Sequence, residues 1–166
     1  MKRITNANYR SDKYYPRVVR AVAAILDRQG FVAPIELFIE MGLLDKQSVA
    51  AWRKGQIPYL EKVIHCNLAV ASRILRILAR HAHDLNLRPS LTGYKRHTRG
   101  PKFQLIFSKY REPRLEEAYV RHFVRVPPKR ELRERLEKSS EPPSAEQPEI
   151  AETAAHELGG GQMRCK

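Results

Sequence analysis

The chain has 166 residues, of which 31 are lysine or arginine and 18 are aspartate or glutamate, so its formal net charge at pH 7 is +13. Its 42% hydrophobic content allows one domain with a buried core, and no apolar run reaches the ~18 residues that a membrane span needs. Cys66 and Cys165 lie far apart, which excludes a disulfide scaffold and a thiolate zinc site and favours a reducing cytoplasm.

The first part of the chain predicts three helices after a short extension. We expect residues 1–13 to form a flexible basic N-terminus and residues 14–126 to form the globular domain. Apolar side chains recur at steps of three and four over Tyr15–Gln29, which predicts an amphipathic helix that Gly30 caps. Pro34 begins a second, short helix that ends at Gly42. Asp45 is the expected N-cap of a third helix that ends at Gly55, with its carboxylate accepting a bond from the first turn.

Two short helices with a glycine-containing turn are followed by Trp52, Gly55 and Pro58, in the spacing W-x-x-G-x-x-P. Residues 35–64 therefore resemble the helix-turn-helix of phage-repressor-like DNA-binding proteins, in which this pattern commonly follows the recognition helix. Phe38 stands where that family has a small residue, and the turn is one residue longer. The alternative is a corner of three helices with ordinary caps. The resemblance implies that the third helix faces the major groove through Lys46, Gln47, Ser48, Ala50 and Ala51, with Arg53 and Lys54 on phosphates.

The strongest periodic pattern comes next. Apolar side chains recur from Ile64 to Leu85 in steps of four and three, which predicts a long central helix beginning at Pro58. The opposite side of this helix is basic, with no acid between Glu61 and Asp84. Because a solvated helix usually mixes its charges, we expect this side to contact a polyanion through Arg73, Arg76 and Arg80. The same helix could pair with a second copy of the chain or with a partner protein.

A basic β-hairpin is predicted after the long helix. Residues 90–97 and 103–109 are rich in β-branched and aromatic side chains, and a loop over residues 98–101 joins them. Residues 88–111 contain seven basic side chains and no acid. A helical core followed by such a ribbon resembles a winged helix-turn-helix, so Lys95, Arg96, Arg99 and Lys102 are expected to contact nucleic acid. Tyr94, Phe103 and Phe107 could instead offer stacking surfaces to unpaired bases. Because Phe103, Leu105 and Phe107 alternate regularly, we expect them to pack in the core, which leaves Tyr94 as the less constrained ring.

The composition changes at the pair Pro127-Pro128. Pro113 begins a last helix, whose inward side is expected to be Leu115, Tyr119 and Phe123. Residues 1–126 carry 24 basic and 10 acidic side chains, whereas residues 127–166 carry 7 and 8. We therefore expect residues 127–166 to be a mostly disordered tail, with one candidate short helix over residues 129–138.

One cluster, His81, His83 and Asp84, could support metal or acid–base chemistry. Positions 81 and 83 are about 200° apart on a helix, so the two imidazoles should diverge. Asp84 is expected to pair with Arg80 or His81, or to cap the helix end. The sequence contains neither a phosphate-binding glycine loop nor a nucleophile elbow. We expect no catalytic residue, metal or cofactor, although a small metal-dependent nuclease using these three residues stays an alternative.

The sequence thus predicts an α+β fold, mostly α, with a helix-turn-helix-like corner, a long helix, a basic hairpin and a C-terminal helix. The favoured function is non-enzymatic nucleic-acid binding, with duplex DNA preferred over RNA and transcriptional regulation as the expected role. An RNA- or ribosome-associated protein and a protein-interaction module remain alternatives. We expect a cytoplasmic protein that does not bind membranes.

Overall fold

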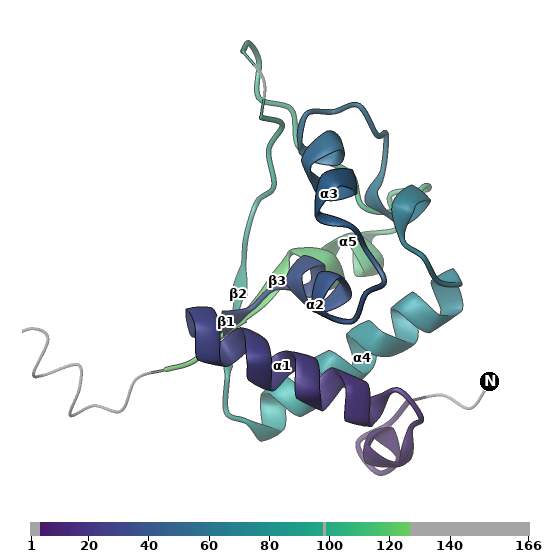
Figure 1. The fold of residues 1–166 in the computed structure, drawn as a ribbon, viewed down its shortest axis with the longest axis vertical. Coiled ribbons are helices and arrows are strands. Elements are labelled where there is room, and N and C mark those ends of the chain that lie inside the picture. The colour runs from purple at the N-terminus through teal and green to yellow at the C-terminus, as the bar shows by residue number, and fades with distance from the viewer. Residues whose placement is uncertain (1–3, 98, 127–166) are drawn as a thin grey trace, which may run out of the picture. The chain divides into compact units, whose positions relative to one another are not determined.

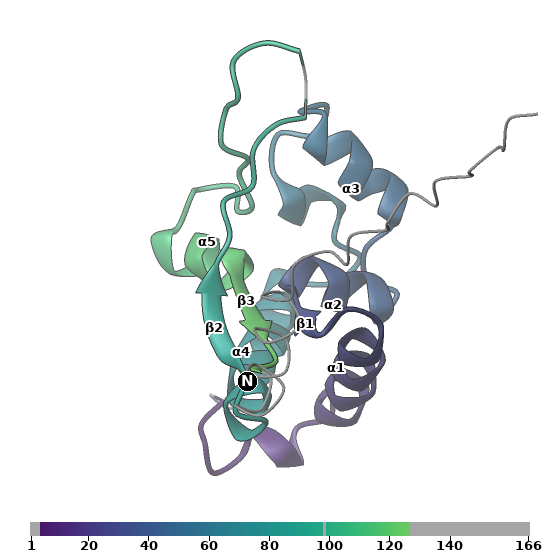
Figure 2. The ribbon, with the colours of Figure 1, turned by 90° about the vertical axis from the view of Figure 1, so that its left-hand side faces the viewer.

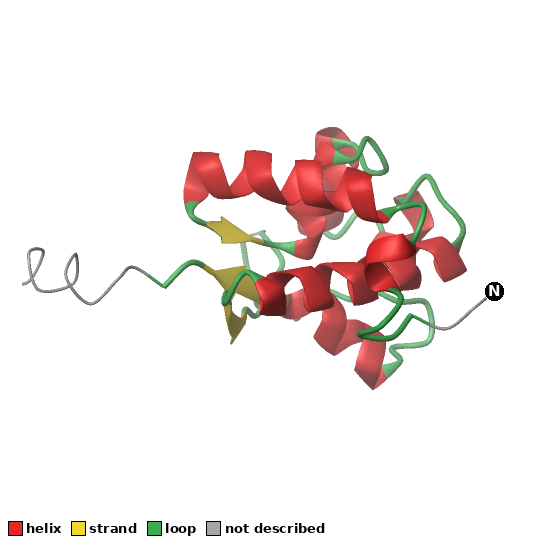
Figure 3. Cartoon of the chain, turned by 90° about the horizontal axis from the view of Figure 1, so that it is seen from below, coloured by secondary structure: helices red, strands yellow, loops and turns green. Residues whose placement is uncertain are grey.

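The computed structural model describes residues 4–97 and 99–126 (Figure 1). Viewed from below, α1 and α4 lie side by side, with the strands near one end of this pair (Figure 3). The described part of the chain is mostly helical with one small sheet, which confirms the predicted class, α+β and mostly α. The elements, in chain order, are η1 (Tyr9–Ser11), α1 (Tyr15–Gln29), β1 (Phe31–Val32), α2 (Pro34–Glu40), α3 (Lys46–Arg53), η2 (Leu60–Val63), α4 (Leu68–Asp84), β2 (Arg88–Leu91), α5 (Pro113–Val120) and β3 (Arg121–Val124).

The sheet is antiparallel, and its strand order is β1-β3-β2. Phe123 on β3 pairs with Val32 on β1 and with Pro89 on β2. Two expectations were therefore wrong. The last helix stops at Val120, because residues 121–124 pair with β2 and residues 123 and 124 also pair with β1. The start of the expected hairpin, residues 90 and 91, pairs with β3 rather than with residues 103–109.

What remains of the expected hairpin is a narrow ribbon, described over residues 94–97 and 99–105. Lys95 and Gln104 form an isolated bridge. The Leu105 N–H donates to the Tyr94 carbonyl at 2.9 Å, and the Arg96 N–H donates to the Phe103 carbonyl at 2.9 Å. We call residues 94–97 and 99–105 the ribbon; Figure 2 shows it beside α3.

Aromatic rings dominate the core where α3, the ribbon and α5 meet. Phe107 stacks on Tyr119 with ring centroids 5.2 Å apart, and Trp52 contacts Phe107 at 5.0 Å. Leu105 and Phe107 are buried as expected, but Phe103 is 62% exposed. The alternation holds only where a helix covers the segment, and it is lost towards the ribbon tip.

The long helix is shorter than its apolar stripe predicts. It begins at Leu68, where the Asn67 side chain caps it by accepting the Ala69 N–H at 2.8 Å. Pro58 does not begin this helix, because the N–H groups of Leu60 and Glu61 donate to the carbonyls of Ile106 and Phe107. In a helix from Pro58 the Glu61 N–H would be the first to donate to a carbonyl one turn back, and it is bonded instead to the chain after the ribbon.

Residues 4–13 pack against the domain and are not the flexible extension that we expected. Ile4 and Tyr9 are buried, and η1 covers one end of α4. Asp12 is also buried, in an ion pair with Arg73. Residues 1–3 and the expected tail 127–166, with its candidate helix 129–138, lie outside the described residues. Within the described residues, each helix is too short or too polar for a bilayer crossing.

Candidate nucleic-acid interface

Helix α3 begins after Asp45 and ends at a left-handed glycine. Gly55 has φ +75°, its N–H donates to the Trp52 carbonyl at 2.8 Å, and the next N–H, of Gln56, donates to Ala51 at 3.0 Å. This pair of bonds is a Schellman C-cap, which favours glycine. Asp45 has extended backbone geometry, but its carboxylate makes no capping bond and faces His65 Nε2 at 3.3 Å. The expected side-chain cap was therefore wrong.

The two faces of α3 differ sharply. Val49 and Trp52 are buried, and the Trp52 indole N–H donates to the Ile106 carbonyl at 2.9 Å. The chain that follows the ribbon therefore supports α3 directly. The expected major-groove residues lie on the other faces: Lys46, Gln47 and Ala50 are exposed, and Ser48 and Ala51 are half-buried.

The turn between α2 and α3 is also closed by a glycine. Gly42 has φ +66°, its N–H donates to Ile39 at 2.9 Å, and the Leu43 N–H donates to Phe38 at 2.8 Å. This second Schellman cap fixes the end of α2 and directs the chain into α3. Phe38, the bulky residue of the helix-turn-helix comparison, is fully buried.

The ribbon docks on the C-terminal end of α3. The His97 N–H donates to the Arg53 carbonyl at 2.7 Å, and Arg96 Nε donates to the Lys54 carbonyl at 3.0 Å. The Arg96 side chain lies against Gly55, where a Cβ atom would come within 2.6 Å of Arg96 Cζ. These bonds satisfy carbonyls at a helix end, where a positive group is also favourable. Helix α3 and the ribbon are therefore held as one unit.

The residues of this unit are basic and include no carboxylate, although the exposed Asp45 directly precedes α3. Residues 46–60 and 85–111 contain no aspartate or glutamate. A hollow of about 530 Å³ on the ribbon is lined by Lys95, Arg96, His97, Arg99, Lys102 and Gly93. We call this hollow, together with the exposed side of α3, the α3–ribbon surface. It contains the following sequence-predicted residues: Lys46, Gln47, Ser48, Arg53, Lys54, Lys95, Arg96, Arg99 and Lys102.

The three arginines expected on the long helix do not join this surface. Arg73 is only 18% exposed and is paired with Asp12, whose side chain is 1% exposed. Burial opposes the charge of Asp12, but the Arg73 guanidinium and the Tyr14 N–H hold its pKa below the usual value. Arg76 and Arg80 are exposed on α4 and line a different hollow, next to α5. Figures 1 and 2 show α4 away from the ribbon tip.

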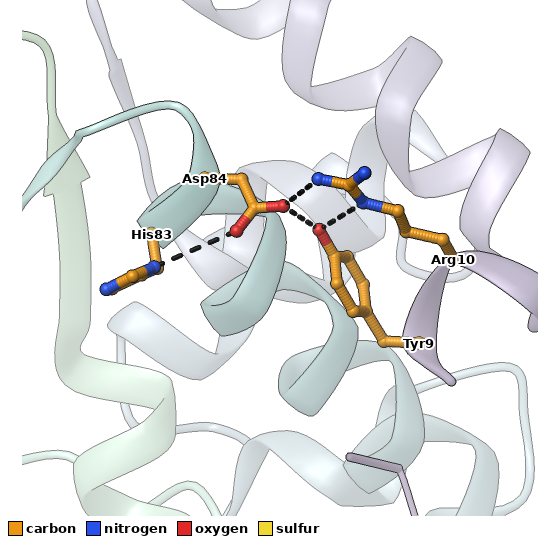
Figure 4. A network of polar contacts seen from close by, with 4 residues as sticks. All are labelled: Tyr9, Arg10, His83 and Asp84. Atoms are coloured by element: carbon orange, nitrogen blue, oxygen red, sulfur yellow. Dashed lines mark hydrogen bonds and ion pairs between the residues drawn. The ribbon is translucent and has the colours of Figure 1, made fainter. Parts of the chain in front are cut away.

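The candidate chemical cluster is divided, as the helical geometry predicts. His81 is buried with its ring edge-on to Tyr15 at 5.6 Å, and burial lowers its pKa; His83 is exposed. Asp84 accepts hydrogen bonds from the Tyr9 hydroxyl and the Arg10 guanidinium, which lower its pKa to about 2 (Figure 4). The prediction that Asp84 pairs with Arg80 or His81 was therefore wrong.

The cluster holds the N-terminal segment on α4. His83 Nδ1 lies 3.7 Å from Asp84 Oδ1, on the side away from Tyr9 (Figure 4). Among the described residues, no three histidine, cysteine or acidic side chains are grouped to hold a metal ion. The arrangement therefore supplies a structural contact between η1 and the end of α4.

The structure changes which aromatic rings are available to stack on unpaired bases. Tyr94 is not free: its hydroxyl lies 2.7 Å from His122 Nε2, its ring contacts Phe107, and burial raises its pKa to about 12. The exposed rings are instead Phe103, at 62%, and Tyr110, at 83%. The sequence offered one hint, since both rings directly follow a lysine in the acid-free stretch.

No family model, curated protein or solved structure matches this chain, so the candidate interface rests on the residues and geometry of the chain itself.

Proposed function

We propose that this chain is a non-enzymatic nucleic-acid-binding protein that binds duplex DNA through the α3–ribbon surface. One observation carries the proposal: the ribbon is bonded to the end of α3 through His97 and Arg96, which joins two basic segments that contain no carboxylate of their own. A surface of one charge sign is the expected footprint of a polyanion-binding protein.

The dimensions of α3 suit the major groove. An α-helix with its side chains is about 10–12 Å across, which matches the width of that groove, and the eight residues of α3 extend about 12 Å along it. In this proposal the exposed Lys46 and Gln47, at the start of α3, approach base edges. The ribbon side chains Lys95, Arg99 and Lys102 contact phosphates, and the terminal nitrogens of Arg96 add a further contact. The base contacts select a sequence and the phosphate contacts supply most of the affinity.

Salt titrations test the electrostatic part. Neutralising about five phosphates gives a slope of log K against log salt near −4.5, because each contact releases condensed counterions. The double change Arg99→Ala and Lys102→Ala should make this slope shallower by about 1.8. The matched control is Arg20→Ala with Arg125→Ala, which removes the same charge from exposed positions elsewhere. Absence of binding at low salt, or an equal loss in the control, contradicts the proposal.

Sequence preference, and hence a role as a transcriptional regulator, is tested on α3. Changing Gln47 and Ser48 to alanine should erase preference for a duplex selected from a random pool. Binding to random duplex should barely change, because phosphate contacts remain. The measurement compares both proteins on the selected and on a random duplex. A wild-type chain that selects no sequence refutes the regulator role and leaves general duplex binding.

The exposed rings favour a second candidate, binding of unpaired RNA. Phe103 and Tyr110 each lie beside a lysine, and Lys109 Nζ is 5.2 Å from the Tyr110 ring centroid. Phe103→Ala should then cost about 1–3 kcal/mol on an unstructured RNA. Leu91→Ala, another exposed apolar side chain, is the control. Loss on RNA with unchanged duplex binding selects this candidate over the first.

A further inference from the structure

A second hollow, of about 820 Å³, lies between α4 and α5. Arg76 and Arg80 stand one helical turn apart on α4, Arg114 is on α5, and Arg121 begins β3. We call this hollow the α4–α5 groove. It shares no lining residue with the α3–ribbon surface.

The groove is strongly positive. Four arginines line it, against one carboxylate, Glu112, among its described lining residues. Arg121 is paired with Glu117, whereas Arg76, Arg80 and Arg114 form no ion pair with any described residue. Unpaired guanidiniums on the two walls of a groove favour a ligand that brings several carboxylates or phosphates.

The floor of the groove is aliphatic. Leu75 and Ala79 of α4 face Leu115 and Ala118 of α5 across it, and both alanines are only half-buried. Short side chains on facing walls allow another backbone to approach closely. The lining residues include one phenyl ring, Phe123, which is buried at 6% exposure, and one imidazole, His83, whose side chain is 89% exposed. The floor therefore suits leucine-like side chains better than nucleobases, which bind to exposed rings.

We propose that the α4–α5 groove binds an acidic amphipathic helix of a partner protein. The apolar face of that helix lies on the half-buried Ala79, Leu115 and Ala118. Its carboxylates, one turn apart, face Arg76 and Arg80, with Arg114 on the other wall. This inference goes beyond the proposed function: because the two surfaces share no residue, the chain can hold the partner helix and a nucleic acid together.

A displayed peptide library tests the proposal with the full chain as bait. The library presents helices of about 16 residues, long enough to remain helical, in which six positions are randomised. We expect selection to enrich leucine or isoleucine on one face, flanked by aspartate or glutamate four residues apart. The best selected peptide is then labelled, and its affinity for purified variants is measured by fluorescence anisotropy.

The double change Arg76→Glu and Arg80→Glu should weaken the selected peptide about tenfold or more, since two favourable charge pairs become repulsive. Arg114→Glu, on the other wall, should weaken it about threefold. Arg20→Glu with Arg125→Glu makes the same charge change elsewhere and should leave affinity intact; circular dichroism confirms that each variant folds. Duplex binding by the α3–ribbon surface is measured separately on the same variants. The nucleic-acid proposal and the partner-helix proposal can therefore be refuted independently.

Three outcomes overturn the proposal. The selection can return no helix, or helices without acidic residues. The peptide can bind the groove and control variants alike. A single-stranded oligonucleotide can displace the peptide, in a manner that Arg76 and Arg80 control, which assigns the groove to nucleic acid instead.

Discussion

Replacing Gly55 by alanine tests whether the ribbon and α3 act as one unit. The new methyl group meets two obstacles. The φ of +75° is costly for a residue with a Cβ atom, and that atom would come within 2.6 Å of Arg96 Cζ. Arg96 must then leave, and its bond to the Lys54 carbonyl, 3.0 Å long in the native protein, is lost.

The expected cost has two parts. The left-handed backbone contributes about 1 kcal/mol, and the lost hydrogen bond contributes about 1 kcal/mol more. Gly55→Ala should therefore lower the free energy of unfolding by about 2 kcal/mol. In an Arg96→Ala background only the backbone part remains, about 1 kcal/mol. The coupling energy between the two sites is thus about 1 kcal/mol, within the range for residues in contact.

Urea denaturation measures all four proteins of this cycle. Trp52 is the single tryptophan of the chain and lies at the α3–ribbon contact, so its fluorescence follows unfolding there. A loss of 2 kcal/mol moves the midpoint by about 1 M urea. Gly55→Ala should also weaken duplex binding, because Arg96 leaves its place. Equal costs of Gly55→Ala with and without Arg96 would show that the side chain does not dock as described, and would refute the reasoning.

Three further predictions concern the core and the charged contacts. Trp52→Phe removes the indole donor to Ile106 and leaves a small cavity, so the free energy of unfolding should fall by about 2 kcal/mol, measured by circular dichroism in urea. Arg73→Met leaves the Asp12 carboxylate buried without its guanidinium and should cost roughly 3 kcal/mol; adding Asp12→Asn should restore part of it, and no recovery contradicts the pairing. Burial lowers the pKa of both His81 and His122, so the unfolded chain binds protons first as the pH falls through about 6.5. The melting temperature should therefore drop between pH 7.5 and 5.5, and less so in His81→Leu. Asp84, whose pKa is about 2, contributes stability that is lost only below about pH 4 and does not explain such a drop.

Apolar spacing and glycine caps correctly predicted the helix ends that depend only on neighbouring residues. The bounds of α1, Tyr15–Gln29, follow from its apolar spacing and from Gly30, which takes φ +70° in the structure. The end of α3 likewise follows from Gly55. These signals act within one helical turn, so neighbouring residues in the sequence are sufficient to read them.

Long-range pairing caused the errors in the fold. Tyr119 and Phe123 are spaced as on one helix face, yet Phe123 lies in β3 because β1 and β2 offer backbone partners there. Similarly, the apolar stripe of α4 continues backwards to Ile64, while the carbonyls of Ile106 and Phe107 hold the N–H groups of Leu60 and Glu61. A periodic pattern does not indicate which distant segment competes for the backbone.

The candidate interface could likewise be predicted only in part. The basic character of the ribbon is a matter of composition and could be predicted. Its contact with α3 depends on Arg96 reaching Gly55, 41 positions earlier in the chain, and no pattern indicates it. Arg73 illustrates the converse, because its sequence position matches an exposed basic face while a buried aspartate from the N-terminal segment engages it.

The central place of β3 in the sheet has a consequence for biosynthesis. Strands β1 and β2 do not pair with each other. Neither strand has a sheet partner until residues 121–124 have been synthesised. Thirty residues separate Leu91 from Arg121, which a ribosome adds in ~2–6 s. During that interval the nascent chain presents two unpaired strands and uncovered apolar helix faces. We expect the emerging chain to depend on chaperone protection until β3 appears, and truncations before Arg121 to aggregate rather than fold.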